Sequence, residues 1–248
     1  MTALLRAELL KVRTVRSWWA YLIAIVLLAG IATASDVGPH DAARDQLQFQ
    51  VRLVDAAGIA ALIAIILGIT IVTTEFRHGT ITPALLVEPH RGRMLAAKAV
   101  AAGLLGAAFA LLALVAIALV AGIWLTAVDA ELHLLDQDVL VRAAQMILLG
   151  VLWTLFGVAI GSIVHSQVAA LVGTLVWVFL GETLVWGLLG LIDLDGVASY
   201  LPFRALDSAD GTNDPDMLPY WGGVAVSLAW IALVGGAGFW RTRRRDIT

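Results

Sequence analysis

The chain has 248 residues, of which 60% are hydrophobic and 14% are charged, and its formal net charge is −3. This composition is too apolar for a water-soluble domain, and the chain is too long for a single membrane anchor. The absence of cysteine excludes a disulfide framework, thiol chemistry and cysteine-ligated metal. We therefore expect an all-α polytopic membrane protein with one transmembrane domain over residues 1–248.

The first 17 residues contain four basic side chains interspersed with leucines. Such a segment is suited to an amphipathic helix that lies among the lipid headgroups. Glu8 and Arg16 fall on the apolar arc of this helix, so its amphipathic character is moderate. We predict an interfacial helix over residues 1–17.

Six apolar stretches follow, and each approaches or exceeds the length of a transmembrane helix. The fourth contains Gly157-x-x-x-Gly161, a spacing that allows close helix packing but also arises by chance in glycine-rich helices. Residues 193–219, before the last stretch, are expected to form a long polar loop. The six predicted spans cover about residues 18–34, 53–73, 99–128, 142–164, 168–192 and 220–240.

Charge is distributed unevenly between the two sides of this arrangement. The N-terminal segment, residues 74–98 and the C-terminal tail hold twelve of the sixteen Lys and Arg residues but only four of the nineteen acids. Because cytoplasmic loops carry an excess of Lys and Arg, we expect these three segments on the cytoplasmic side. The protein is then a multi-pass protein of the cell membrane with both termini in the cytoplasm, as six spans require.

Residues 74–98 join the second and third spans and combine a glycine, two prolines and clustered basic residues. Thr80 is a good N-cap for a short helix, and Pro83 suits its first turn. Pro89 would stop that helix, because the residue before a proline avoids helical angles. We predict a short amphipathic helix over 81–87 at the membrane surface. A basic loop held inside by its charge is an equally good interpretation of the spacing alone.

The sequence lacks the motifs of common catalytic sites. It has no G-x-x-x-x-G-K-[ST] phosphate loop, no H-E-x-x-H and no G-x-S-x-G, and its five histidines are scattered without ligand spacing. We expect no enzymatic activity, no metal site, no bound cofactor and no nucleic-acid partner for this chain.

Glu182 is the one acid well inside an apolar span. A carboxylate near the bilayer centre costs about 2.5 to 3.5 kcal/mol on insertion scales, so it should face a helix interface or a wet cavity. Its functional interpretation is a proton or substrate contact in a translocation path. Its structural interpretation is a hydrogen bond to a neighbouring helix or a position near the interface.

The segment between the second and third spans resembles that of the permease subunits of type-2 ATP-binding-cassette exporters. Those permeases are similar to this chain over its whole length, with an amphipathic N-terminal helix, six spans and a cytoplasmic segment after the second. A departure is the extra charge around Gly92 and Arg93. The family's loose pattern of Glu, three residues, Gly-Thr, Leu-Leu, Pro, a basic residue and Lys is matched by Glu75, Gly79, Thr80, Leu85, Leu86, Pro89, Arg91 and Lys98.

The resemblance implies that residues 74–98 form a coupling helix resting on a separate ATPase subunit, which binds ATP and Mg²⁺. It also implies a second permease, identical or related, and export of a drug, an antibiotic or peptide, or a lipid-like substrate. Glu75 would end the second span and hold Arg77 or Arg91. The residues expected to couple the chain to the ATPase are Glu75, Arg77, Gly79, Thr80, Leu85, Leu86, Pro89, Arg91 and Lys98.

Two other functions are compatible with the sequence. A non-transporting immunity or sensor subunit would recruit an ATPase through the same segment without moving a substrate. A secondary transporter would use Glu182 and an ion gradient, although one intramembrane acid offers little for coupling. The acidic outer loops would suit a cationic amphiphile, but membrane topology alone also explains their charge.

Overall fold

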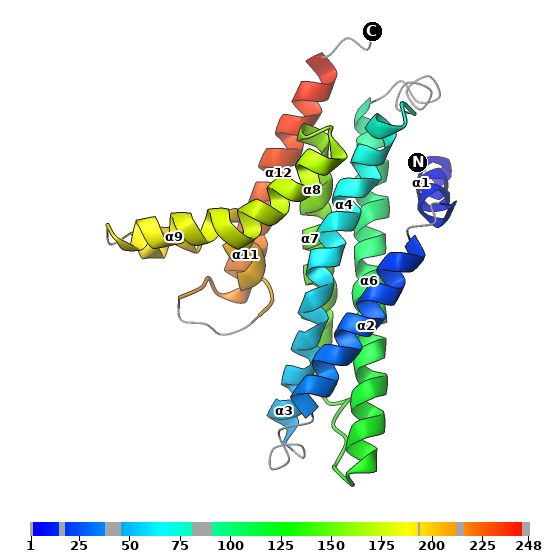
Figure 1. The fold of residues 1–248 in the computed structure, drawn as a ribbon, viewed down its shortest axis with the longest axis vertical. Coiled ribbons are helices and arrows are strands. Elements are labelled where there is room, and N and C mark those ends of the chain that lie inside the picture. Colours follow the sequence, from blue (N-terminus) through cyan, green and yellow to red (C-terminus); the bar gives the residue numbers. More distant parts are fainter. Residues whose placement is uncertain are drawn as a thin grey trace.

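Four long helices form the trunk of the protein in a computed structural model (Figure 1). The structure describes residues 2–14, 18–37, 46–80, 91–192, 194–211 and 216–244, and these contain helices and no strands. Because most side chains in these segments are apolar, helices that satisfy their own backbone hydrogen bonds are the expected membrane structure. The four helices are α2 (Trp18–Val37), α4 (Ile59–Arg77), α6 (Arg91–Ala127) and α7 (Gln137–Ile163).

Among the described residues, five helical stretches are long and apolar enough to cross a membrane, which confirms the prediction of an all-α membrane protein. Each overlaps one of the second to sixth predicted spans, but the one that matches the third span begins at Gly92, within the segment 74–98 that was predicted to precede it. The first predicted span, 18–34, falls within α2, whose apolar stretch Trp19–Ser35 is shorter than the other five. The five stretches are Leu47–Arg77, Gly92–Ala127, Gln137–Ile163, Gln167–Gly190 and Tyr220–Arg241.

Glycines allow α4 and α7 to pack at the centre of the trunk. A Cβ atom added at Gly157 would lie 2.3 Å from the carbonyl oxygen of Ile65, and one added at Gly68 would lie 2.1 Å from that of Thr154. Side chains at these positions would therefore force the two backbones apart. The Gly157-x-x-x-Gly161 spacing does mark a close contact, because Gly161 also faces α4 at Ile69.

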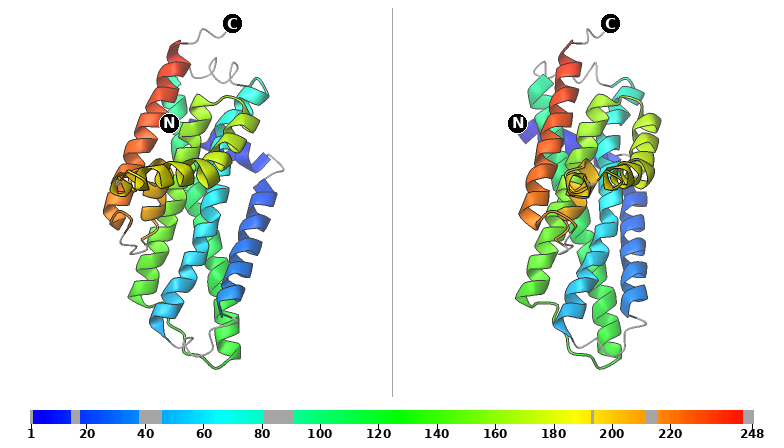
Figure 2. Two further views of the ribbon diagram at one scale, coloured as in Figure 1. Left: turned by 60° about the vertical axis from the view of Figure 1, so that its left-hand side comes forward. Right: turned by 90° about the vertical axis from the view of Figure 1, so that its left-hand side faces the viewer.

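The second span begins with a short helix, α3 (Leu47–Leu53), and a 3₁₀ turn, η2 (Val54–Gly58), which continues directly into α4. The fifth span consists of α8 (Gln167–Val176), a π-helical turn η3 (Trp177–Gly181) and α9 (Glu182–Gly190). The helix changes direction after α8, so that α9 runs across the long axis of the trunk (Figures 1 and 2).

The segment predicted as a polar loop, 193–219, contains two short helices. They are α10 (Asp195–Ala198) and α11 (Pro202–Ser208). Pro202 occupies the first turn of α11, where its missing amide hydrogen costs nothing. Phe203 and Leu206 are buried against the trunk and the last helix, so this part of the predicted loop is a packed element.

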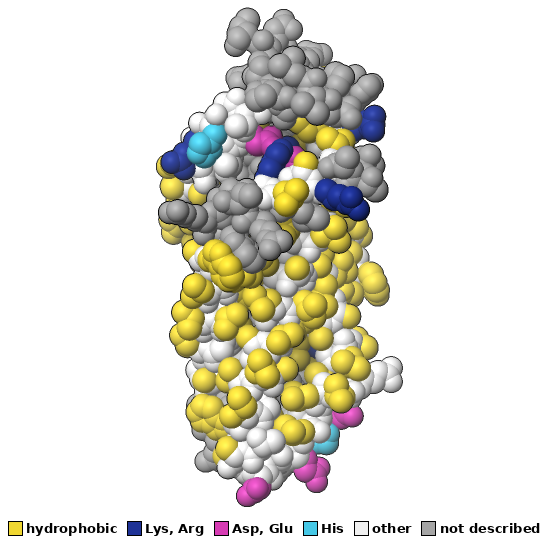
Figure 3. All heavy atoms as spheres, turned by 90° about the vertical axis from the view of Figure 1, so that its right-hand side faces the viewer, with side chains coloured by type: hydrophobic (Ala, Val, Ile, Leu, Met, Phe, Trp, Pro, Cys, Tyr) yellow, Lys and Arg dark blue, Asp and Glu magenta, His cyan; other side chains and the backbone are white. Residues whose placement is uncertain are grey.

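The two ends of the described chain lie at the same end of the trunk. The N-terminal helix α1 (Thr2–Thr14) and the last turns of α12 (Tyr220–Arg244) are near the point where α4 ends and α6 begins (Figure 1). One face of the molecule shows basic and acidic side chains near that end, apolar side chains over the middle and acids at the opposite end (Figure 3). This pattern fits a membrane belt between two polar ends.

Candidate functional site

The second span ends in a glycine turn that uses the glycine and threonine of the Glu-x-x-x-Gly-Thr pattern. Gly79 has a φ of +64°, in the left-handed region that side chains disfavour. The amide of Thr80 donates to the carbonyl of Glu75 at 3.0 Å, and the amide of Gly79 donates to that of Phe76 at 3.3 Å. This pair of hydrogen bonds is the Schellman arrangement that satisfies the last carbonyls of a helix.

Four charged side chains from three helices meet beside this turn, and we call them the charge cluster: Glu8, Lys11, Glu75 and Lys98. Lys98 Nζ donates to Glu75 Oε1 at 2.5 Å and to Glu8 Oε2 at 2.9 Å. Lys11 Nζ donates to Glu75 Oε1 and to Glu8 Oε1, both at 2.7 Å. Each lysine therefore bridges the same two carboxylates, and the four formal charges cancel.

Three members of the charge cluster are buried: Glu8, Glu75 and Lys98 are 7%, 6% and 2% exposed. Lys11 closes the cluster on its exposed side. Burial lowers the pKa of Lys11, but the hydrogen bonds that it donates to Glu75 and Glu8, together with their negative charges, outweigh that effect and raise its pKa above the ordinary value. Lys11 therefore stays charged at neutral pH. Removing one partner from such a group would leave a buried charge uncompensated.

The helices position these four groups from the two ends of residues 74–98 and from the N-terminus. Glu75 lies in the last turn of α4, and Lys98 lies in the second turn of α6. Glu8 and Lys11 are three residues apart on α1 and so share one face of that helix. Because α1 packs on α6, this face meets the two ends of the segment.

The end of α4 also contacts the turn between α7 and α8. Arg77 Nη1 donates to Gln167 Oε1 at 3.1 Å, and the rings of Phe76 and His165 lie 4.1 Å apart, centroid to centroid. Glu75 was expected to hold Arg77 or Arg91; in the structure it pairs with the two lysines of the charge cluster and Arg77 with Gln167, and the side chain of Arg91 lies outside the described residues. The end of the second span is thus fixed to α1, α6 and the α7–α8 turn.

The predicted coupling residues divide into three groups. Glu75 and Lys98 are in direct contact, whereas Gly79 and Thr80 form the turn and Arg77 points to α8. Arg91 begins α6, but its side chain lies outside the described residues. Leu85, Leu86 and Pro89, with the predicted helix 81–87, also lie outside them.

Glu8 and Lys11 were missed as site residues by sequence reasoning. A signal was present, because Glu8 falls on the apolar arc of the N-terminal helix, where an unpaired carboxylate is unfavourable. The structure places Glu8 on the buried face of α1, paired with Lys98 and Lys11.

Glu182 lies away from the charge cluster and binds the start of α11. Its two carboxylate oxygens accept hydrogen bonds from the amides of Phe203, at 2.6 Å, and Arg204, at 3.0 Å. These amides have no partner within α11, and a carboxylate is favourable at a helix N-terminus. Glu182 is 5% exposed, so its contacts match the structural interpretation, a bond to a neighbouring helix.

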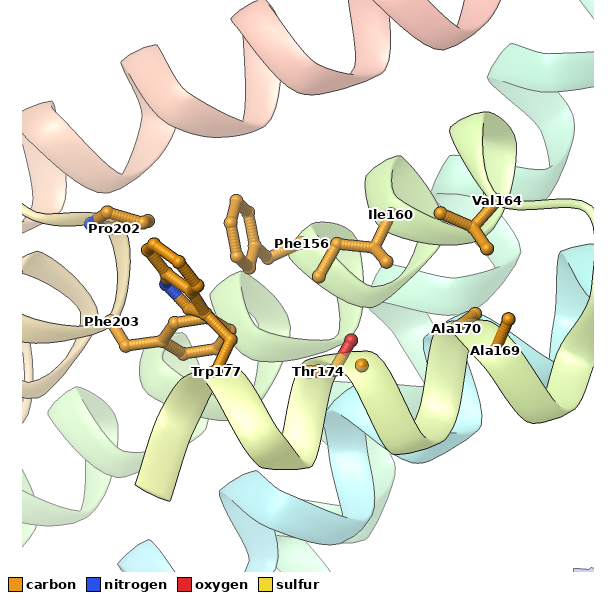
Figure 4. Close-up of a pocket in the computed structure, with 10 residues that line it drawn as sticks. Phe156, Ile160, Val164, Ala169, Ala170, Thr174, Trp177, Pro202 and Phe203 are labelled. Carbon is orange, nitrogen blue, oxygen red and sulfur yellow. The ribbon is translucent and has the colours of Figure 1, made fainter. Parts of the chain in front are cut away.

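An apolar cavity of about 240 Å³ lies between α7, α8 and α11. In Figure 4, Trp177, Phe203 and Phe156 lie at one end of it, and Val164 and Ala170 lie toward the other. Phe203, which Glu182 holds through its amide, packs its ring 5.2 Å from that of Phe156. Glu182 thus positions α11 as one wall of the cavity.

A family model described as ABC-2 family transporter protein matches residues 4–181. The match covers more than half of the chain and includes all four residues of the charge cluster. No curated protein matches the chain.

Proposed function

Because the chain belongs to the ABC-2 family of transporter proteins and is a multi-pass membrane permease of an ABC transporter, we propose that it is the translocation subunit of an ATP-driven exporter. A separate ATPase subunit binds ATP and Mg²⁺ and drives this chain through residues 74–98. Both termini and this segment lie in the cytoplasm, where the ATPase is. A second permease, identical or related, completes the translocation path for a drug, an antibiotic or peptide, or a lipid-like molecule.

The charge cluster is the observation that carries this proposal. It joins Glu75 at the end of α4 to Lys98 near the start of α6, so the two ends of the segment meet at a fixed point. A push on residues between them acts on both membrane helices together. Salt bridges of 2.5 to 2.9 Å among buried groups are suited to this task, because their geometry is tightly constrained.

The N-terminal helix takes part in this coupling as well. Glu8 and Lys11 join α1 to the same fixed point, so α1 follows any movement of the ends of α4 and α6. Arg77 carries the movement to Gln167 at the start of α8. A displacement at the ATPase therefore reaches four helices through named contacts.

The experiment is to express the tagged chain with its ATPase and to compare it with the variant Glu75→Gln. ATP hydrolysis by the purified complex and uptake of rhodamine 6G and of a fluorescent phosphatidylcholine into inside-out vesicles are measured. We expect the variant to copurify with the ATPase and hydrolyse ATP while transport falls at least tenfold. The matched control is Arg6→Gln, an exposed charge on α1.

Failure to recover the ATPase with the wild-type chain would refute the proposal. Recovery of the ATPase with neither probe moved would favour the immunity or sensor function instead. Transport that needs an ion gradient but no ATP, and that Glu182→Gln abolishes, would identify a secondary transporter.

A further inference from the structure

A second cavity, of about 310 Å³, lies between η2, α4, α7 and α11 and has no part in the coupling contacts. Its volume is at the lower end of the range for sites that hold small molecules. Its lining includes apolar side chains, among them Leu62, Met146 and Trp153, and charged ones, Asp55, Arg142, Asp207 and Asp210. A cavity with such a mixed lining suits a molecule with one apolar and one charged part.

The positive charge of Arg142 in the cavity wall is already neutralised. Arg142 Nε donates to Asp55 Oδ1 at 2.5 Å, and its Nη1 donates to Gln145 Oε1 at 3.2 Å and to the carbonyl of Asp210. Arg142 is only 7% exposed, so these partners hold it in place. The pair of Arg142 and Asp55 adds no net charge to the cavity.

Asp207 supplies a carboxylate that accepts no hydrogen bond from the part of the chain that the structure describes. Its side chain is exposed where it lines the cavity, while neighbouring protein atoms shield much of the carboxylate from water. Burial, and then the negative charges of Asp210 and Glu182, raise the pKa of Asp207 to about 7, against the opposing effect of Arg204. A cation in the cavity would relieve this unfavourable environment.

Trp153 contributes an aromatic ring to the apolar lining of the cavity. It is 4% exposed and lines the cavity, and its indole Nε1 has no hydrogen-bond partner among the described residues. A buried donor without an acceptor costs about 1 to 3 kcal/mol. The apolar part of a guest in the cavity would pack on the indole ring.

Gly58 shows that the cavity has room on the side of η2. It lines the cavity, and a Cβ added there would meet nothing within 4 Å. A larger side chain at this position would therefore occupy the cavity without moving the backbone.

We propose that this cavity binds an organic cation, with its ammonium group facing Asp207 and its apolar body packed against Leu62, Met146 and Trp153. The inference rests on the proposed function, because it names an amphiphilic cation as the substrate class of the permease. Binding at this cavity precedes any movement driven by the ATPase, so it is measurable without that subunit.

The test uses the purified chain in phosphatidylcholine nanodiscs and two radiolabelled probes in equilibrium dialysis. Benzyltrimethylammonium carries a permanent charge, and neopentylbenzene is its neutral isostere. We expect Asp207→Asn to weaken binding of the cation at least tenfold and to leave the neutral probe unchanged. Gly58→Leu should weaken both probes, whereas Gly58→Ala and Asp138→Asn, which removes an exposed carboxylate, should affect neither.

The pH dependence provides a further readout, because the probe itself does not titrate. Protonation of Asp207 removes the negative charge that attracts the cation, so binding should weaken as the pH falls through 7. Between pH 8 and pH 6 a group with this pKa loses about tenfold in its ionised fraction, and affinity should fall by that factor. The neighbouring charges, Asp55, Arg142, Asp210, Glu182 and Arg204, remain in the Asp207→Asn variant, which should show no such change.

Equal affinity of wild type and a folded Asp207→Asn variant for the cation would overturn the inference. Competition by calcium ions at equal concentration would do the same, because it would indicate an inorganic cation site. If Asp207→Asn does not fold, unchanged binding to Gly58→Leu overturns it. Loss of ATP-driven transport with binding intact would refute the proposed function alone.

Discussion

Glu75 makes two independent sets of contacts, one with its backbone and one with its side chain. Its carbonyl accepts the amide of Thr80 and closes the glycine turn, while its carboxylate pairs with Lys11 and Lys98. The spacing of Glu75 and Gly79 follows from this double role, because the turn must begin where the carboxylate still points to α6. The glutamate and glycine of the pattern therefore serve one local structure.

Replacement of Lys98 by methionine should be strongly destabilising, because it leaves Glu8 and Glu75 buried with only Lys11 between them. The loss of one partner from a buried ion pair typically costs about 3 to 5 kcal/mol. The free energy of unfolding in mixed micelles with dodecyl sulfate measures the effect. In a Glu8→Gln background the same substitution should cost less, and Arg6→Gln should change stability by less than about 0.5 kcal/mol.

The variant Gly79→Ala tests the turn. Gly79 has a φ of +64°, in the left-handed region, where a residue with a Cβ atom is less stable by about 1 to 2 kcal/mol. Gly236→Ala is the matched control, because a Cβ at this helical position meets nothing within 4 Å and should stabilise α12 by about 0.5 to 1 kcal/mol. Thermal unfolding should therefore shift in opposite directions for the two variants, and equal shifts would contradict this account of the turn.

At the scale of elements, α4 and α7 can approach closely because glycines, which have no side chain, lie at their contact. A methyl group at Gly157 would lie 2.3 Å from the carbonyl oxygen of Ile65, so Gly157→Ala must separate the helices. Overpacking of this kind costs about 1 to 3 kcal/mol. Unfolding of the variant should be compared with that of Gly187→Ala in α9, where a Cβ has open space. Similar stability of the two variants would show that α4 and α7 are not in close contact.

The elements differ in how well the sequence predicts them. Long apolar stretches specify α4, α6 and α7, because length and composition are enough for a membrane helix. The short helix α11 has no such signal, since seven residues hold barely two helical turns. Its position depends on Glu182, a residue twenty positions earlier that binds its first free amides. The local sequence of α11 gives no indication of this contact with Glu182.

The same reasoning applies to the charge cluster. The sequence pattern identified Glu75 and Lys98 separately, as matches to a family motif, and suggested Arg77 or Arg91 as a partner of Glu75. The actual partners lie on α1 and α6, and helix packing alone brings them together. An acid on the apolar arc of an amphipathic helix, as at Glu8, is the local clue to such a distant partner.

For the whole molecule, the arrangement of the ends is testable because the chain has no cysteine. The end of α4 and the turn between α6 and α7 lie at opposite ends of the trunk (Figure 1). Single cysteines at Thr80, three residues after α4, and at Leu135, which is 85% exposed in that turn, would report on these two ends. A membrane-impermeant maleimide should label Leu135→Cys in intact cells and Thr80→Cys only after permeabilisation. The reverse pattern would place residues 74–98 outside the cell, where no ATPase could drive them.

The charge cluster also constrains the order in which the newly made protein matures. Glu8, Lys11 and Glu75 leave the ribosome before Lys98. Until Lys98 follows, two carboxylates share one lysine, Lys11, and the group has a net negative charge. The charge cluster becomes neutral only when α6 has been synthesised and Lys98 contacts Glu8 and Glu75. Docking of the N-terminal helix is consequently completed late in biogenesis, and in a chain truncated before residue 98 the contact of Lys11 with Glu75 would be the remaining link between that helix and α4 within the charge cluster.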